Sequence, residues 1–265
     1  MTIAMDPTAT RATSKATHEL AQRFIDAGLP STSFRILGRT GLTVSALGFG
    51  AYRVDARSPE HRLALEQALE SGCNLIDTST NYADGESEEC IGATLEAGFL
   101  QGTLSRGDRV VVSKTGYVQG QNLDLARQRE TAGDPFPEMV KISQGCWHCL
   151  HPSFLEDQLT RSLQRLKLAC LDVCLLHNPE YFLEQAHRQG QEVEEARQEF
   201  YRRIRVAFGH FEKEVRAGRI AWYGVSSNSF GENPANPEAT SLGRMLEAAG
   251  AAGHEAGSEG GVHHF

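Results

Sequence analysis

Apolar and polar positions along the chain follow two periods in turn, which predicts strands alternating with helices. Short apolar runs typical of buried strands occupy 42–50, 74–78, 109–113, 171–176 and 220–225. Apolar residues at helical spacing follow them, and we expect helices over 58–72, 86–97, 153–166, 180–217 (interrupted near Gly190) and 238–249. The stretch 115–152 has neither period and is expected to be irregular. Strands alternating with helices indicate right-handed βαβ units and a parallel sheet.

Two architectures with a parallel sheet compete, a doubly wound open sheet and an eight-stranded barrel. The open sheet that binds dinucleotides needs a G-x-G-x-x-G turn after its first strand. Gly48-Phe49-Gly50 is followed here by Ala51-Tyr52-Arg53, so the third glycine is missing. Polar residues instead stand where successive strands end, and in a barrel these ends share one active-site face: Asp77, Lys114, His177 and Ser226. The pattern therefore favours an α/β fold of the (β/α)8 TIM-barrel type.

The barrel predicted from this chain is incomplete, with about five of eight βα units. The chain that follows Ser226 is too short for three further units at the spacing of the first five. We expect a disordered N-terminal segment with a short helix over 1–32 and a partial barrel domain over 33–265. An open barrel exposes apolar strand edges, so we expect this chain alone to fold poorly and to lack measurable activity.

The charge and cysteine content of the chain bear on the kind of partner and on the cellular location that we expect. The 26 basic and 34 acidic residues give a net charge of −8, which argues against nucleic acid or an anionic membrane as the main partner. No apolar run has the length of a membrane span, and the first 15 residues do not resemble a secretory signal. Six cysteines are too few for a disulfide scaffold, so we expect reduced thiols and a cytoplasmic location. The oligomeric state is left open.

Four residues near three successive strand ends could act on a carbonyl group: Asp77, Tyr82, Lys114 and His177. A tyrosine hydroxyl is a weak acid, but a nearby ammonium group favours its phenolate form. An aspartate can hold that lysine in place, and a neutral histidine can donate a hydrogen bond to a carbonyl oxygen. Each residue alone has a structural explanation. Together they predict a site that protonates a carbonyl oxygen while a hydride reaches its carbon.

Several short segments lie at or near the predicted strands and the helices between them: GLTVSALGFG at 41–50, DTSTNY at 77–82, GESE at 85–88, VSK at 112–114, SLQRL at 162–166, LDVCLLHNP at 171–179, GRI at 218–220 and YGVS at 223–226. With these segments, in this order, the chain resembles the aldo/keto reductase family over 34–265. The resemblance implies a βα barrel that reduces small aldehydes or ketones with a nicotinamide cofactor, usually NADPH, with NADH possible.

The resemblance also implies a role for individual residues. Tyr82 corresponds to the general acid, tuned by Lys114 and Asp77, and His177 to the residue that orients the carbonyl. Residues implied to contact the cofactor are Gly50, Ala51, Tyr52, Asp77 and Ser226, with the second contact to the nicotinamide amide made by either Ser227 or Asn228. The family's later strands supply an aromatic that stacks on the nicotinamide and groups that hold the cofactor phosphates. None is found here, where 263–265 looks like the approach to a sixth strand.

Other hypotheses rest on parts of the same sequence. The chain could be a non-catalytic barrel remnant that binds or regulates a partner. A metal-dependent barrel hydrolase using Asp77 and His177 ranks last, because the first strand offers no pair of histidine ligands. The segment Cys146-Trp147-His148-Cys149, with His151 close behind, carries the residue types that bind zinc. No second cysteine pair lies at a suitable spacing, so we predict small packing thiols and no metal site.

Overall fold

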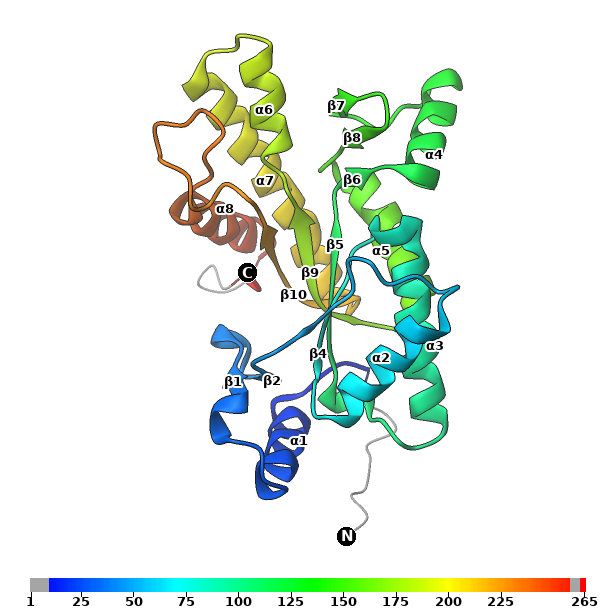
Figure 1. The fold of residues 1–265 in the computed structure, drawn as a ribbon. Helices are drawn as coiled ribbons and strands as arrows, with labels where there is room; N and C mark the ends of the chain where they lie inside the picture. The colour runs from blue at the N-terminus through cyan, green and yellow to red at the C-terminus, as the bar shows by residue number, and fades with distance from the viewer. Residues whose placement is uncertain (1–9, 258–262) are drawn as a thin grey trace. The chain divides into compact units, whose positions relative to one another are not determined.

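The computed structural model describes residues 10–257 and 263–265, and Figure 1 shows their helices and strands. The helices are α1 Ser14–Asp26, α2 Pro59–Glu70, α3 Glu86–Leu100, α4 Gly120–Thr131, α5 Pro152–Leu166, α6 Tyr181–Arg188, α7 Val193–Arg216 and α8 Leu242–Glu255. The strands are β1 Phe34–Ile36, β2 Thr43–Ser45, β3 Phe49–Gly50, β4 Leu75–Asp77, β5 Val110–Thr115, β6 Tyr117–Val118, β7 Val140–Ser143, β8 Cys146–His148, β9 Leu171–His177 and β10 Ile220–Ser226.

Five strands form the main sheet in the order β10-β9-β5-β4-β3. Neighbouring strands β3, β4 and β5 run parallel, with Asp77 in register with Gly50 on one side and Val112 on the other. Every residue of β5 is buried, as expected of a valine-rich strand covered on both faces. The predicted α/β fold with a parallel sheet of five strands is confirmed.

The chain divides into two compact units, and the boundaries fall within β5, α5 and β9. The first unit holds the residues up to Ser113 together with Arg161–Val173. In this unit the prediction of a single strand over 42–50 is wrong, because the segment forms two strands, β2 and β3. β2 pairs antiparallel with β1, and β3 enters the main sheet. The chain leaves one sheet for the other at Ala46-Leu47-Gly48, where all three residues are exposed. The apolar run is continuous in sequence, but the strand is interrupted there.

The N-terminal helix belongs to the packed core of the first unit. α1 begins at Ser14, and the hydroxyl of Thr13 caps it by accepting the N–H of Ala16 at 3.2 Å. Just before it, Ala12 is buried and its N–H donates to the carboxylate of Asp172 at 2.7 Å. The short helix expected within 1–32 is thus α1, and residues 1–9 of that expected segment lie outside the described part.

The second unit comprises Lys114–Thr160 and the residues from Cys174 onward. The stretch 115–152, expected to be irregular, contains α4 and an antiparallel sheet in the order β6-β8-β7 (Figure 1). These strands have two to four residues each, which is too short for a visible period. A hydrophobic cluster holds them against α4 and α5: Val118, Leu123, Ala126, Phe136, Trp147, Cys149 and Phe154.

The mixed charges of 192–216 are typical of a solvated outer helix, but α7 is buried on one side. One of its faces is fully buried and carries Phe200, Ile204, Phe208 and Phe211. The break before it lies at Gly190, as predicted, where φ is +72°. Beyond α8, the carbonyl of His264 accepts the N–H of Tyr223 at 2.8 Å, so this end of the described chain lies along β10.

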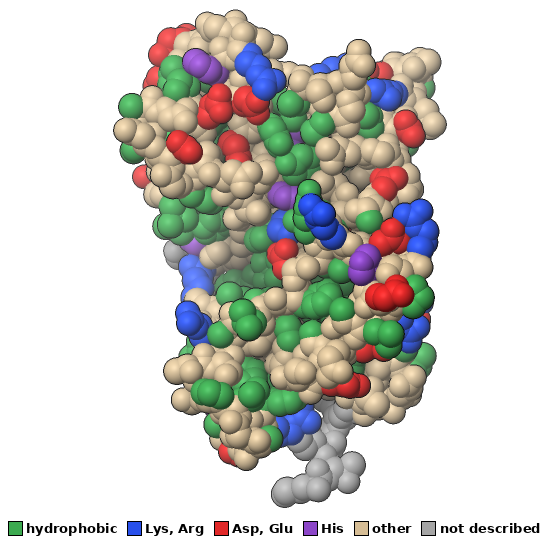
Figure 2. Space-filling model, in the orientation of Figure 1, with side chains coloured by type: hydrophobic (Ala, Val, Ile, Leu, Met, Phe, Trp, Pro, Cys, Tyr) green, Lys and Arg blue, Asp and Glu red, His purple; other side chains and the backbone are tan. Residues whose placement is uncertain are grey.

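Surface charge is mixed in sign on the face drawn in Figure 2, where acidic and basic side chains alternate among polar and apolar ones. Among the described residues, no helix combines the length and the apolar character that crossing a bilayer requires.

Candidate active site

Asp77 and Tyr82 lie in the first unit. Asp77 is the last residue of β4, and Tyr82 opens the 3-10 turn Tyr82–Gly85. Ala83 and Asp84 in this turn adopt left-handed backbone angles, with φ of +48° and +55°. Such angles are costly for residues with a Cβ and persist where surrounding contacts enforce them. The loop after β4 is therefore held in one defined shape.

Hydrogen bonds inside the first unit fix that loop against the turn after β3. The hydroxyl of Ser87 donates to the carbonyl of Ala51 at 3.0 Å and lies 2.8 Å from the hydroxyl of Thr78. The rings of Tyr52 and Tyr82 meet edge to face, with centroids 5.2 Å apart. Tyr52 is 66% exposed, so one face of this tyrosine pair is open to a ligand.

A buried carboxylate anchors β5 one residue before Lys114. Glu88 accepts the hydroxyl of Ser113 at 2.5 Å, the hydroxyl of Ser162, and the guanidinium of Arg165 at 2.7 Å. All these groups belong to the first unit. Because a buried charge is tolerated only when it is paired and hydrogen-bonded, this cluster fixes the strand where the candidate lysine follows.

Lys114 and His177 lie in the second unit, and both are buried, with 5% and 8% of their surface exposed. His177 is the last residue of β9. Burial lowers the pKa of His177 to about 3, with further contributions from the nearby charge of Lys114 and from His148. The imidazole of His177 is therefore neutral at physiological pH. A neutral imidazole can donate a hydrogen bond to a carbonyl without transferring its proton.

An aromatic and polar cluster surrounds His177. The ring of Tyr117 stands edge-on to that of His177 with centroids 4.7 Å apart. Its hydroxyl accepts the side-chain amide of Asn178 at 3.0 Å and donates to the hydroxyl of Tyr181 at 3.1 Å. Nε2 of His148 lies 2.7 Å from the backbone oxygen of His177. The sequence did not predict this cluster. The one indication was His148, which lies between Cys146 and Cys149 in a segment whose residue types suggested a zinc site.

The residues implied to contact a cofactor are divided between the units in the same way. Gly50, Ala51, Tyr52 and Asp77 are in the first unit, where the N–H of Ala51 donates to the carbonyl of Asp77 at 2.8 Å. In the second unit, Ser226 ends β10, and the hydroxyl of Ser227 lies 3.2 Å from those of both Ser229 and Thr240. Asn228 is exposed, and its backbone N–H donates to the carboxylate of Glu180 at 2.7 Å.

Cys149 packs in the hydrophobic cluster of the second unit. It is fully buried, and burial raises the pKa of its thiol to about 12, which disfavours the thiolate that binds metals. Nδ1 of His151 lies 2.8 Å from the hydroxyl of Ser153 at the start of α5. Within 10–257 and 263–265, no group of three or more His, Cys, Asp or Glu side chains is arranged to hold a metal ion.

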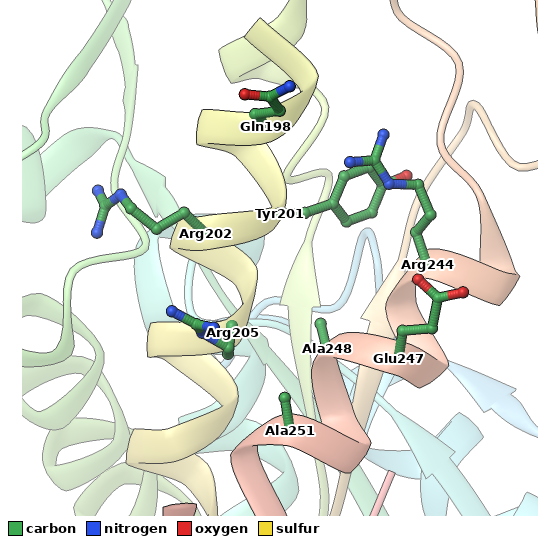
Figure 3. A pocket seen from close by; sticks show the side chains of 8 residues that line it. All are labelled: Gln198, Tyr201, Arg202, Arg205, Arg244, Glu247, Ala248 and Ala251. Atoms are coloured by element: carbon green, nitrogen blue, oxygen red, sulfur yellow. The ribbon is translucent and has the colours of Figure 1, made fainter. Parts of the chain in front are cut away.

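A groove between α7 and α8 is lined by none of the predicted residues. Figure 3 shows Arg202, Arg205 and Arg244 around it. Each faces a carboxylate: Arg202 lies 2.6 Å from Glu199, Arg205 3.7 Å from Glu255, and Arg244 3.6 Å from Glu194. The positive charge of the groove is thus already compensated.

Comparison with known proteins places this chain in a family. Residues 46–233 match the model of the aldo/keto reductase family, and the chain belongs to that family. A Schizosaccharomyces pombe protein provisionally named a voltage-gated potassium channel subunit beta is 30% identical over 152 residues, 56% of this chain and 37% of that one. The S. pombe NADP+ aldo-keto reductase yakc is 27% identical over 192 residues, 71% of this chain and 44% of that one. This chain thus spans less than half of either relative.

Solved structures give the same fold. An aldo-keto reductase from Bacillus halodurans, in its holo form, superposes with a TM-score of 0.52 at 23% identity. The match covers 74% of this chain and 51% of that one. The five-stranded parallel sheet is therefore that of the aldo/keto reductase barrel, as the motifs predicted.

Proposed function

We propose that this protein reduces aldehydes or ketones to alcohols with a nicotinamide cofactor. The observation that carries the proposal is the buried, neutral His177 near the charge of Lys114. The same family member has Asp77 at the end of β4 and Tyr82 in the turn that follows. A neutral hydrogen-bond donor, a lysine and a tyrosine are the groups that carbonyl reduction needs.

Strand register supports bringing these residues to one site. Asp77 is in register with Val112 on β5, and Lys114 follows Val112 by two residues on the same strand. Side chains two apart on a strand point to the same face. We propose that Asp77 and Lys114 share that face and that the Tyr82 hydroxyl reaches the Lys114 ammonium directly or through one water.

In the proposed reaction a nicotinamide cofactor, when bound, supplies the hydride that adds to the carbonyl carbon. His177 donates a hydrogen bond to the carbonyl oxygen and orients it. Tyr82 transfers its phenolic proton to that oxygen as the alcohol forms, and the phenolate later regains a proton from water. Lys114 stabilises the phenolate by its charge, and Asp77 holds Lys114 in position.

The residues present fit a nicotinamide. Ser226 and Asn228 carry hydroxyl and amide groups that match a carboxamide, and the hydroxyl of Ser227 is already engaged with Ser229 and Thr240. We therefore propose Asn228 for the second amide contact. Gly50 is exposed, and a Cβ there would meet nothing within 4 Å, so the turn leaves room for a ligand.

NADPH is the cofactor we propose, with NADH as the alternative. Curated relatives are named for NADP+, NADH and NAD(P)H, so the family uses both. We also propose a cytoplasmic location, which the free state of all six cysteines fits.

The experiment is NADPH oxidation, with a panel of small aldehydes and ketones, by this chain completed with the family's later strands, since we expect the chain alone to lack measurable activity. Tyr82→Phe removes the proton donor and keeps the ring, so kcat should fall about 10²–10⁴-fold, the usual worth of general acid catalysis. Cofactor affinity measured by calorimetry should stay within about 2-fold, since the hydride donor is not held by that hydroxyl. Near-normal turnover in Tyr82→Phe would exclude Tyr82 as the acid.

A second candidate function is partner regulation without turnover, favoured by the relative provisionally named a channel subunit. Cofactor binding without carbonyl reduction by the wild type, together with capture of a specific partner, would favour it over the reductase.

A further inference from the structure

The peptide group that joins His177 to Asn178 is hydrogen-bonded on both sides within the second unit. Its N–H donates to the carbonyl of Ser226 at 2.6 Å, and its oxygen lies 2.7 Å from Nε2 of His148. The next residue is strained, because Asn178 has a φ of +47°. A strained residue keeps its shape only when its neighbours enforce it, and these two hydrogen bonds do so.

His148 reaches this oxygen from a buried position on β8, where its ring also packs against those of Tyr117 and Tyr181. It is 1% exposed and lies on β8, in register with Tyr117 of β6 and Val140 of β7. A backbone carbonyl can only accept, so Nε2 of His148 must carry the hydrogen. Burial lowers the pKa of His148 to about 4, which keeps the imidazole in the neutral form that donates through one nitrogen.

Gly116 makes the approach of His148 possible. A Cβ on Gly116 would lie 2.6 Å from Nε2 of His148 and 3.1 Å from the oxygen of His177. Its φ of +140° is also unfavourable for any other residue. The backbone holds the pair from the other side, where the N–H of Cys149 donates to the carbonyl of Gly116 at 2.9 Å.

We propose that His148 is a positioning residue for the reaction: it fixes the backbone of His177 and so aims the His177 imidazole at the substrate carbonyl. The segment between β5 and α5 therefore serves the active site through β8. This inference rests on the proposed function for the role of His177. The hydrogen bond itself can be tested without turnover.

The first test is NMR of the protein with 15N-labelled histidine. In the wild type, His148 should appear as the neutral Nε2-H form, and His148→Phe should move the ring signals of His177. His148→Gln, which restores an N–H donor, should leave them near their wild-type positions. Unchanged His177 signals in His148→Phe would overturn the proposal, whether or not the protein is an active reductase.

Kinetics then separate positioning from a general loss of structure. We expect kcat to fall at least 10-fold in His148→Phe and to recover mostly in His148→Gln, with the KM for NADPH unchanged in both. Equal kcat values in the two variants would contradict a role for the N–H donor. A wild type without turnover would instead defeat the proposed function and leave the NMR result to decide on His148.

Gly116→Ala tests the same contact without changing either histidine. It should move the His177 signals as His148→Phe does. Gly133→Ala is the control for left-handed strain, since Gly133 has a φ of +79° but a Cβ there meets nothing within 4 Å. Gly145→Ala is the control for an added methyl in open space of the same segment. His177 signals that move equally in all three variants would contradict the proposal.

Discussion

At the scale of single residues, burial rather than pairing sets the charge of the histidines around the site. His148 and His177 are buried beside other donors and a lysine, and their pKa values fall to about 4 and about 3. Both are therefore neutral when folded. In the unfolded chain a histidine has a pKa near about 6.5.

The low pKa of His148 predicts a pH dependence of stability. Its contribution is fully present above about pH 6.5 and is lost as the pH falls toward 4, because only the unfolded chain binds the proton in that window. Between pH 7 and pH 5 the loss is about 2 kcal/mol for this one group.

Urea unfolding of the wild type and of His148→Gln at pH 7 and pH 5 measures this loss of stability. The free energy of unfolding should fall by about 2 kcal/mol more in the wild type than in the variant. Parallel pH dependence in the two proteins would mean that His148 is not buried as a neutral base. Comparing two proteins cancels the titration of the buried carboxyls, which acts in the opposite direction.

At the scale of elements, helices α3 and α5 touch at a glycine. A Cβ on Gly92 would lie 2.8 Å from the backbone of Leu166 and closer still to the carbonyl oxygen of Arg165. These helices carry Glu88, Ser162 and Arg165, the cluster that anchors β5 before Lys114. Their close approach is therefore part of what positions the strand.

Gly92→Ala should lower the free energy of unfolding by about 1–3 kcal/mol, because backbone atoms cannot move aside as a flexible side chain can. The matched control is Gly209→Ala in α7, where a Cβ meets nothing within 4 Å. There the same change should stabilise by up to about 1 kcal/mol through helix propensity. Equal effects of the two substitutions in urea unfolding would refute the close packing.

Elements with a clear period were predictable, and short or mixed ones were not. The strand at 109–113 and the break at Gly190 follow from valine runs and glycine conformation. The three short strands over 117–148 have too few residues to show alternation, and α4 buries only Asn122, Leu123 and Ala126. The charge pattern of α7 predicts a solvated helix because its arginines and glutamates outnumber the phenylalanines of its buried face.

In the candidate site, the positions of Asp77, Lys114 and His177 at or next to the ends of their strands could be predicted from chain order. Their roles in catalysis stay a prediction. The contact of His148 could not be predicted, because its partner is a backbone oxygen that is distant in sequence and leaves no motif.

At the scale of the whole molecule, the segment that matches the family also contains the candidate catalytic residues. The family match covers most of the chain, from 46 to 233, and every catalytic residue implied by the resemblance falls within it. The chain spans less than half of the two curated relatives described above, so the activity of the whole protein is a proposal. Its central claim is hydride transfer to a carbonyl carbon with proton donation by Tyr82.

The most direct test is isotope transfer from NADPH in which both hydrogens at the reactive carbon of the nicotinamide are replaced by deuterium, since only one of them is transferred. The protein is incubated with this cofactor and a small aldehyde, and the alcohol is analysed by mass spectrometry. We expect one deuterium on the former carbonyl carbon with the wild type of the completed chain, and about 10²–10⁴-fold slower formation of that product with Tyr82→Phe. Absence of deuterated alcohol with the wild type, or equal rates for the two proteins, would contradict it.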